Sequence, residues 1–260
     1  MKCAIMQPTY IPWIGYFDLI DSVDKFVFLD DVKLEKCSWQ VRNRIKTSQG
    51  ELYLTVPIKS TKSRLELMIN EAEINDNIPW RKKHLKSIFF AYKKTKYFEE
   101  VYPFLEKLID NNIILIKDFN INIIKSIAYK IGIETEFEIS SKLEVSGKKD
   151  YRLISICKEL GCDEYISPQG SAVYLEKTKP CGAFDNSKIS LYYFNYKHPI
   201  YNQLYGDFLP FMSIVDLLFN EGFKNALDII RSGREDPIDC IIFRERYLKR
   251  LTVDNLRKNS

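Results

Sequence analysis

Short apolar runs and amphipathic stretches alternate at the start of the chain. Residues 3–6 (CAIM) are apolar and stop at Gln7-Pro8, which is typical of a buried strand that ends in a loop. Apolar positions then recur at helical spacing over residues 15–23, and residues 25–30 (KFVFLD) are rich in β-forming side chains. A strand, a helix and a second strand in this order predict the βαβ unit of a parallel sheet.

The middle of the chain is predicted to be mainly helical. Residues 80–97 place apolar side chains at i, i+3, i+4 and i+7, and residues 100–110 continue in the same way. A third strand is predicted over residues 52–58 (LYLTVPI), after a polar segment over residues 31–50 that is predicted to be a long loop. Long polar loops are commonly functional. Residues 61–112 are interpreted as a mostly helical insertion or side layer.

Strands and helices alternate again in the second half of the chain, with Gly132 and Gly161 at helix ends. The pattern predicts strands at residues 135–139, 164–167 and 189–194, helices at 120–131 and 151–160, and one or two helical turns at 171–176. Ser213 and Asp216 form a capping signature for a further helix that ends at Gly222, and residues 223–231 are helical again.

The whole pattern predicts an α/β protein. We expect a parallel sheet of βαβ units with a helical insertion and a C-terminal helical tail. Residues 1–232 are expected to form a single α/β domain, and residues 233–260 a basic helical tail.

Composition and charge narrow the classes of function. The 260 residues are 45% hydrophobic and 28% charged, as in ordinary globular proteins, and the net charge is +4. So mild a charge does not indicate nucleic-acid binding, whereas anionic small molecules such as nucleotides remain candidates. No apolar run is long enough to span a membrane, and no signal peptide is recognisable, so the chain is expected in the cytoplasm.

Cysteine and histidine usage argues against a metal site. The six cysteines are scattered without a C-x-x-C pair, and the chain has two histidines. In a cytoplasmic protein the cysteines are expected to be reduced thiols. Cys37 lies in the charged loop, where either an activated nucleophile or a small buried side chain fits the pattern.

Polar residues follow several strands of the predicted sheet. Gln7 and Tyr10 follow the first strand, Asp30 and Asp31 follow the second, and a later strand is followed by Ser167, Ser171 and Tyr174. Ligands of open α/β folds bind at the carboxyl ends of the strands, so these loops are expected to share one cleft. The chain has neither G-x-G-x-x-G nor G-x-x-x-x-G-K-[ST], which argues against the usual dinucleotide and P-loop sites.

Two other groups of side chains suggest recognition of an anion. Arg42, Asn43 and Arg44 follow Trp39 in the predicted loop; the guanidinium groups suit a phosphate or carboxylate, and Trp39, like Trp13, offers a flat face. Pairing of the arginines with Asp30, Asp31 or Glu35 is the alternative. The predicted helix at residues 80–97 also carries six lysines without an acid, which indicates either a solvated face or an anion-attracting one: Lys82, Lys83, Lys86, Lys93, Lys94 and Lys96.

His198 is the candidate general base. It lies with Tyr201 and Gln203 in a polar, aromatic loop after a predicted strand, and histidine suits proton transfer near neutral pH. A structural role in a turn before Pro199 is the alternative. Asp216 is a further candidate for a carboxylate in the site. Its position three residues after Ser213 is explained more simply by helix capping.

Several long motifs resemble the WbqC-like family. They are QPTYIPWIGYFDLI, FVFLDDV, SWQVRNRI with LTVPI, GCDEYISPQGSAVYL and YKHPIYNQLYGDFLPFMSIVDLLFNEG, which together extend over most of residues 1–230. The resemblance implies a role in bacterial surface-polysaccharide biosynthesis, such as that of lipopolysaccharide O-antigen, and a cytoplasmic step on a nucleotide-linked amino sugar. The order of elements also resembles the nucleotidyltransferase and pantothenate-synthetase fold, but H-x-G-H is missing after Pro8.

From residues and resemblance together, we expect a transferase that forms an amide on a nucleotide-linked amino sugar. The donor would be a small acyl or aminoacyl compound, with glycyl as one candidate group. His198 is the expected base and Asp30 the second choice. Substrate binding is expected from Gln7, Tyr10, Trp13, Asp31, Trp39, Arg42, Asn43, Arg44, Ser167, Ser171, Tyr174, Tyr201 and Gln203.

Two alternatives stay open. One is an ATP-dependent acid-activating or nucleotidyltransferase-like enzyme, with ATP as its candidate cofactor. The other is a non-catalytic binding protein of a polysaccharide assembly complex. No nucleic-acid partner is expected, and a homodimer is left open.

Overall fold

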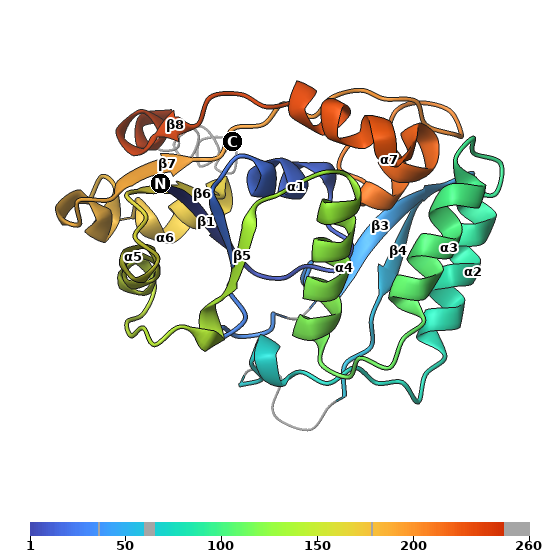
Figure 1. Ribbon diagram of the computed structural model, residues 1–260, viewed down its shortest axis with the longest axis horizontal. Helices are drawn as coiled ribbons and strands as arrows, with labels where there is room; N and C mark the ends of the chain where they lie inside the picture. The colour runs from blue at the N-terminus through green and yellow to red at the C-terminus, as the bar shows by residue number, and fades with distance from the viewer. Residues whose placement is uncertain (36, 60–65, 178, 247–260) are drawn as a thin grey trace, which may run out of the picture.

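A computed structural model of the chain describes residues 1–35, 37–59, 66–177 and 179–246, and it has an α/β fold (Figure 1). The described residues form a six-stranded, mostly parallel sheet with the order β5-β2-β1-β6-β7-β8. Its strands are β1 (Lys2–Met6), β2 (Lys25–Phe28), β5 (Glu136–Ile139), β6 (Glu164–Ser167), β7 (Ser190–Tyr193) and β8 (Ile238–Asp239). Only β8 runs antiparallel to its neighbour, and the predicted α/β class is confirmed.

Alternation along the central strands builds a core on each face of the sheet. On β2, Phe26 and Phe28 enter one core, and Val27 enters the other. On β1, Ala4 joins the first core, whereas Cys3 and Ile5 join the second. A one-residue shift of either strand would exchange the two sets, so the differently sized side chains would have to repack in both cores.

Helices cover both faces of the sheet and continue to one side. They are α1 (Ile14–Asp21), α2 (Trp80–Tyr92), α3 (Phe98–Ile109), α4 (Ile116–Lys130), α5 (Asp150–Glu159), α6 (Ala172–Leu175) and α7 (Ile214–Ser232). Short 3-10 turns are η1 (Ile69–Glu71), η2 (Ser140–Lys142), η3 (Gln169–Ser171) and η4 (Gly182–Asn186). Residues 61–65 of the predicted insertion and 247–260 of the predicted tail lie outside the described residues.

The predicted break between two C-terminal helices is confirmed as a kink in α7. The Ser213 hydroxyl caps the helix by accepting a hydrogen bond from the Val215 amide at 3.3 Å. At the kink, Gly222 has a φ of 76°, and a Cβ there would lie 2.7 Å from the Tyr97 ring. Glycine is therefore required both by the backbone and by the close approach of Tyr97.

Two predictions about the segment before α2 are wrong. The polar segment predicted as one long loop contains strand β3 (Arg42–Thr47), and β3 pairs antiparallel with β4 (Gly50–Thr55) in a separate two-stranded sheet. The predicted third strand thus does not join the parallel sheet. Charged residues on the outer face of β3 hid its alternation, because Asn43 and Ile45 are buried between Arg42, Arg44 and other polar side chains.

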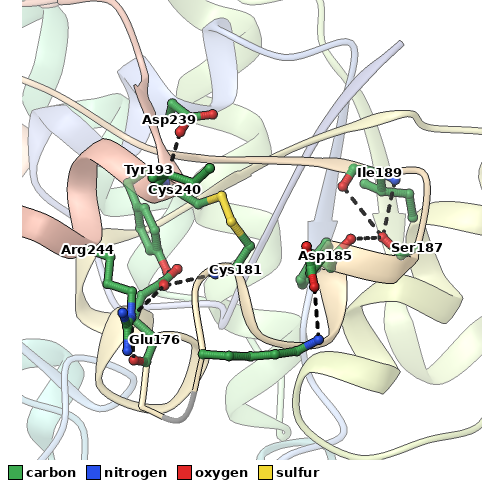
Figure 2. Close-up of a disulfide and its surroundings, with 12 residues drawn as sticks. Glu176, Cys181, Asp185, Ser187, Ile189, Tyr193, Asp239, Cys240 and Arg244 are labelled. Carbon is green, nitrogen blue, oxygen red and sulfur yellow. Dashed lines mark hydrogen bonds and ion pairs between the residues drawn. A yellow bond between two sulfur atoms is a disulfide. The ribbon is translucent and has the colours of Figure 1, made fainter.

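A disulfide joins the C-terminal segment to the body of the sheet (Figure 2). Cys181 and Cys240 are bonded across 59 positions, next to the pairing of β7 with β8. The buried Glu176 carboxylate accepts hydrogen bonds from the Tyr193 hydroxyl at 2.7 Å and the Cys181 amide at 2.9 Å. The expectation of six reduced thiols is therefore wrong for these two cysteines, because strand pairing unites residues that look unrelated by spacing. Cys3, Cys37, Cys157 and Cys162 are free.

The described residues contain no helix that is both long enough and apolar enough to cross a membrane.

Candidate functional site

The strand order reverses at β1: β2 and β5 lie on one side of it, and β6 and β7 lie on the other. The loops after β1 and β6 therefore diverge and leave a crevice at the carboxyl ends of these two strands. Such a switch point is where open α/β sheets bind ligands. Two cavities of about 270 and 280 Å³ lie in this region. Both are lined by Met6, Trp13, Tyr16 and Phe211, and we call the pair the Trp13 cleft.

Trp13 lines both cavities. It is the N-cap residue of α1, and Gly15 follows in the first turn of that helix. The indole contacts Tyr196 and Phe211 edge-on at centroid distances of 5.6 and 5.4 Å, and it stacks against His198 at 6.0 Å. These contacts join the start of the chain to the segment after β7, so the cleft forms only when both are folded together.

The first cavity combines aromatic walls with a cation and an unpartnered hydroxyl. Trp39 is 48% exposed and stacks on Tyr53, which also lies under the Arg42 guanidinium at 5.0 Å. Arg44 donates through Nη1 to both Glu51 carboxylate oxygens at 2.9 Å and through Nε to the Phe211 carbonyl at 3.2 Å.

Asn43 and Thr9 also line this cavity, and the Asn43 amide has hydrogen-bond partners whereas the Thr9 hydroxyl has none among the described residues. Asn43 donates to the carbonyls of Tyr10 and Ile11, so its amide holds the loop after β1. Thr9 is 7% exposed, and its hydroxyl is buried without a hydrogen-bond partner among the described residues. A buried unpartnered hydroxyl is costly, which makes Thr9 a candidate ligand-binding group.

The second cavity is bounded by the loop after β6 and the end of β7. It is lined by Gly15, Leu19, Pro168, Gln169, Phe194 and Tyr196 in addition to the shared residues. Gln169 donates from Nε2 to the Phe194 carbonyl at 2.9 Å, which leaves its Oε1 facing no described donor. Ser167 and Ser171 do not line this cavity; their hydroxyls bond to each other, and Ser171 donates to the Pro168 carbonyl at 2.6 Å.

His198 lies behind the Trp13 indole, in a cluster with Tyr201, Phe208 and Phe211. Its Nδ1 hydrogen-bonds the Pro199 carbonyl at 2.8 Å, and because a carbonyl only accepts, Nδ1 carries the proton. Nε2 is buried and has no partner among the described residues. Burial lowers the pKa of His198, so the neutral ring with a free Nε2 lone pair is the form at neutral pH.

Asp30 and Asp31 follow β2 and bind the turn that follows β5, and neither lines a cavity of the Trp13 cleft. The Asp30 carboxylate is fully buried and accepts from Ser141, through both its amide and its hydroxyl, and from Lys117 at 3.2 Å. Asp31 pairs with Arg152 and accepts from Ser140. Through these partners the two carboxylates stabilise the packing of the segments that follow β2 and β5.

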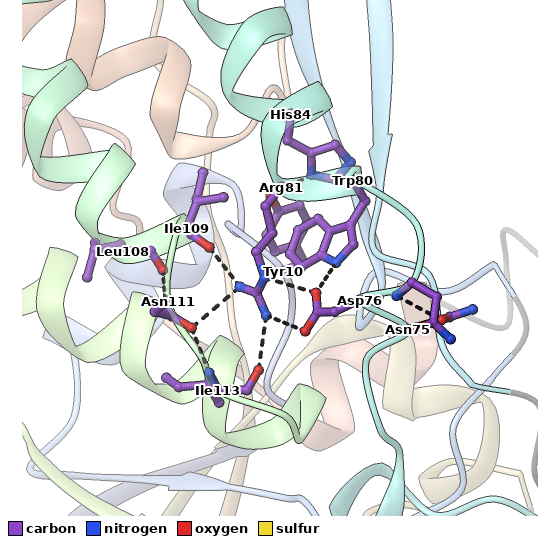
Figure 3. Close-up of polar contacts among 11 residues, drawn as sticks. Tyr10, Asn75, Asp76, Trp80, Arg81, His84, Leu108, Ile109, Asn111 and Ile113 are labelled. Atoms are coloured by element: carbon purple, nitrogen blue, oxygen red, sulfur yellow. Dashed lines mark hydrogen bonds and ion pairs between the residues drawn. The ribbon is translucent and has the colours of Figure 1, made fainter.

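Tyr10 belongs to the core between α2 and α4. Its side chain is fully buried, and its hydroxyl hydrogen-bonds His84 Nδ1 at 2.9 Å. Beside it, Arg81 is paired with Asp76 at 3.0 Å and donates to the carbonyls of Ile109 and Ile113, as Figure 3 shows. This arrangement fastens α2 to the turn before α4 and leaves Tyr10 without a face toward the cleft.

The other predicted binding residues are distributed around the cleft or away from it. Gln7 accepts from Gln40 at 3.0 Å through its side chain and from the Tyr16 hydroxyl at 3.0 Å through its carbonyl, so it supports one wall. Tyr174 lines a separate cavity with Asp150 and Lys158.

Tyr201 and Gln203 hydrogen-bond the buried Asp216 carboxylate at 3.0 and 2.7 Å, together with Tyr92 at 2.9 Å. Gln203 also accepts from the buried Lys46 ammonium group at 3.1 Å. Burial raises the pKa of Asp216, and the hydrogen bonds from Tyr92, Tyr201 and Gln203 oppose that rise. The network holds the loop that carries Phe208 and Phe211.

Sequence reasoning missed most of the aromatic lining. Gln169 and Tyr196 lie inside segments whose sequence indicates polar loops, so a signal existed for them. Met6, Thr9, Tyr16 and Phe211 carry no local signal, because the sequence of a strand, helix or loop does not tell whether such a side chain faces a core or a cavity. No group of three or more His, Cys, Asp or Glu in the described part of the chain is arranged to hold a metal ion.

Comparisons with known proteins identify relatives but no established activity. The family model described as the WbqC-like protein family matches residues 7–227. The chain is 36% identical over 236 residues to the "Uncharacterized protein Rv1507c" of Mycobacterium tuberculosis, which covers 90% of this chain and 99% of that protein. No solved structure matches the chain.

Proposed function

This chain belongs to the WbqC-like protein family, and we propose that it is a transferase of surface-polysaccharide sugar biosynthesis that forms an amide on a nucleotide-linked amino sugar. The observation that supports the proposal most is the pair of cavities that share Trp13 as a wall. Two adjoining compartments suit a reaction between two substrates, because a donor and an acceptor meet at their boundary.

The lining of the first cavity suits the nucleotide part of such a substrate. Trp39 offers an exposed ring for a base or a sugar. Arg44 is the charged residue among the described residues that line the two cavities; it is paired with Glu51 through Nη1, and its Nη2 donates to no described residue. A guanidinium donor at the edge of an aromatic cavity is suited to a diphosphate.

The chemistry requires an acceptor amine, an activated acyl carbonyl and a base. The amine nitrogen attacks the carbonyl carbon, the C–N bond forms, and the bond to the donor's leaving group breaks. The amine loses a proton, for which Nε2 of the neutral His198 is the proposed acceptor. Because Nε2 is buried, one of the covering rings must move before a substrate reaches it, and Phe211 is 49% exposed.

The test combines binding with turnover. A panel of nucleotide-linked amino sugars is screened by the shift in melting temperature, and amide formation from acyl and aminoacyl donors is followed by mass spectrometry. We expect His198→Gln to keep the melting shift and to lose roughly 10²- to 10⁴-fold in turnover. Arg44→Gln is expected to weaken binding instead.

Three outcomes would speak against the proposal. Wild-type turnover by His198→Gln removes that residue as the base. AMP or pyrophosphate release that requires ATP together with the amino sugar favours the acid-activating alternative. No melting shift with any nucleotide sugar or donor favours the non-catalytic binding protein.

A further inference from the structure

Helix α2 presents lysines and phenylalanines together on its outward face. At about 100° per residue, these side chains occupy roughly 120° of the helix circumference, and the opposite side is buried. We call this surface the α2 lysine face; it consists of Lys82, Lys83, Lys86, Phe89, Phe90 and Lys93, all exposed.

The positive charge of this face is not neutralised by neighbouring acids. None of its lysines forms an ion pair with a described residue, and no acidic residue occurs from position 77 to position 98. The remaining charge on the helix, Arg81, turns inward to Asp76. Glu51 on β4 is bound to Arg44, and the next acids along the chain, Glu99 and Glu100, begin α3.

The two aromatic rings lie within this charged surface. Phe90 is 55% exposed and Phe89 is 36% exposed, and the Lys93 ammonium group lies 5.1 and 5.7 Å from their ring centroids. Next to Phe90, a depression of about 500 Å³ between α2 and β4 is lined by Leu52, Lys83 and Lys86 among others. Exposed apolar rings among ammonium groups combine the two features that bind proteins to anionic membrane surfaces.

We propose that the α2 lysine face docks on a lipid bilayer that contains anionic headgroups. The ammonium groups contact lipid phosphates, and Phe89 and Phe90 enter the boundary between headgroups and acyl chains. A soluble anion would satisfy the lysines but leave Phe90 in water, whereas a bilayer accepts both. In Figure 1, α2 lies at one end of the long axis, opposite α5, so a flat surface can approach it from outside.

Co-sedimentation with lipid vesicles tests the proposal on the full chain. Vesicles of phosphatidylcholine are compared with vesicles that also contain phosphatidylglycerol, at low and high salt. The chain is expected to sediment with the anionic vesicles at low salt and to be released by high salt, because screening weakens the attraction. Each lysine near the surface contributes about fivefold to partitioning, so Lys82→Glu, Lys83→Glu and Lys86→Glu combined lower it by about 100-fold or more.

A matched variant controls for net charge. Lys142→Glu, Lys148→Glu and Lys158→Glu change the charge equally near α5, where all three side chains are exposed, and this variant is expected to retain most of the binding. Phe90→Ser, with the charge unchanged, is expected to lower binding severalfold at every salt concentration. Melting temperatures of all variants are measured alongside.

Each contrary result has a definite meaning. Equal binding to neutral and anionic vesicles, or equal loss in both triple variants, overturns docking through this face. Concentration-dependent self-association that is lost only in the α2 variant, without vesicle binding, assigns the face to a second copy of the chain instead. Binding to soluble polyglutamate but not to vesicles assigns it to a soluble anionic partner and also overturns the proposal.

Discussion

The indole of Trp13 lies directly against the backbone of Gly15. A Cβ atom placed on Gly15 would fall 2.2 Å from a ring carbon of Trp13, closer than any packed contact allows. Glycine at this position therefore lets the ring take the place in which it lines both cavities of the Trp13 cleft. The same ring stacks on His198, so the Trp13 side chain connects Gly15 with the proposed base.

Gly15→Ala is expected to displace the indole and to destabilise the protein by about 1–3 kcal/mol, as overpacking does. In a Trp13→Ala background, Gly15→Ala should instead stabilise the protein, because alanine is favoured over glycine in a helix by about 1 kcal/mol. Urea unfolding of the four proteins measures this double-mutant cycle. Equal effects of Gly15→Ala in both backgrounds would mean that the ring and the glycine are not coupled.

Thr9→Val removes the buried hydroxyl that has no partner among the described residues. We expect the free energy of unfolding to stay the same or rise by up to about 1 kcal/mol, since no hydrogen bond is lost. Affinity for a ligand of the cleft should fall about fivefold, and Thr9→Ser should retain it. Isothermal titration and urea unfolding measure the two effects; a large loss of stability would show that the hydroxyl is satisfied.

The buried His84 should make stability fall in mild acid. Burial lowers the pKa of His84 to about 4, below the 6.5 of a free histidine. The unfolded chain therefore takes up the proton first, and stability is lost as the pH falls below about 6.5 toward 4. Between pH 7 and pH 5 this amounts to about 2 kcal/mol. Urea unfolding of wild type and His84→Gln isolates the effect, because the variant should lack that part of the pH dependence.

Asp216→Asn should break the buried network behind the Phe211 loop. The new amide would present a donor to Gln203, which already donates to that oxygen at 2.7 Å, and a negative charge that interacts with the buried Lys46 would be lost. We expect a loss of about 1–3 kcal/mol, as for a buried donor left without its acceptor. Asp207→Asn removes the same charge from an exposed side chain and should change stability by less than about 0.5 kcal/mol.

The disulfide between Cys181 and Cys240 is a covalent link that mass spectrometry can detect directly. Proteolysis without reductant should yield a peptide pair joined through Cys181 and Cys240. Reductant should lower the stability of wild type by up to about 4 kcal/mol on chain-entropy grounds, for a loop of this length. The double variant Cys181→Ser with Cys240→Ser should unfold identically with and without reductant, and a reductant effect there would contradict this assignment.

The local pattern of the sequence determined the main elements of this fold. The β-forming run of residues 25–28 and the signals at Ser213 and Gly222 sufficed because each depends on neighbours in the chain. The long motifs likewise sufficed to indicate the WbqC-like family, since a motif is a property of the sequence itself. Local pattern failed at β3, where Arg42 and Arg44 on the outer face make a strand look like a polar loop.

Tertiary structure alone decided which polar residues are available to a ligand. Asp30, Tyr10 and Gln203 looked like binding groups in the sequence, but their polar atoms already bind Ser141, His84 and Asp216, which lie 111, 74 and 13 positions away. Conversely, Trp13 meets His198 and Phe211 only because β1 and β7 belong to one sheet. The sequence shows which polar residue types are present. Whether each has a hydrogen-bond or ion-pair partner depends on contacts between separate segments, which a local pattern does not encode.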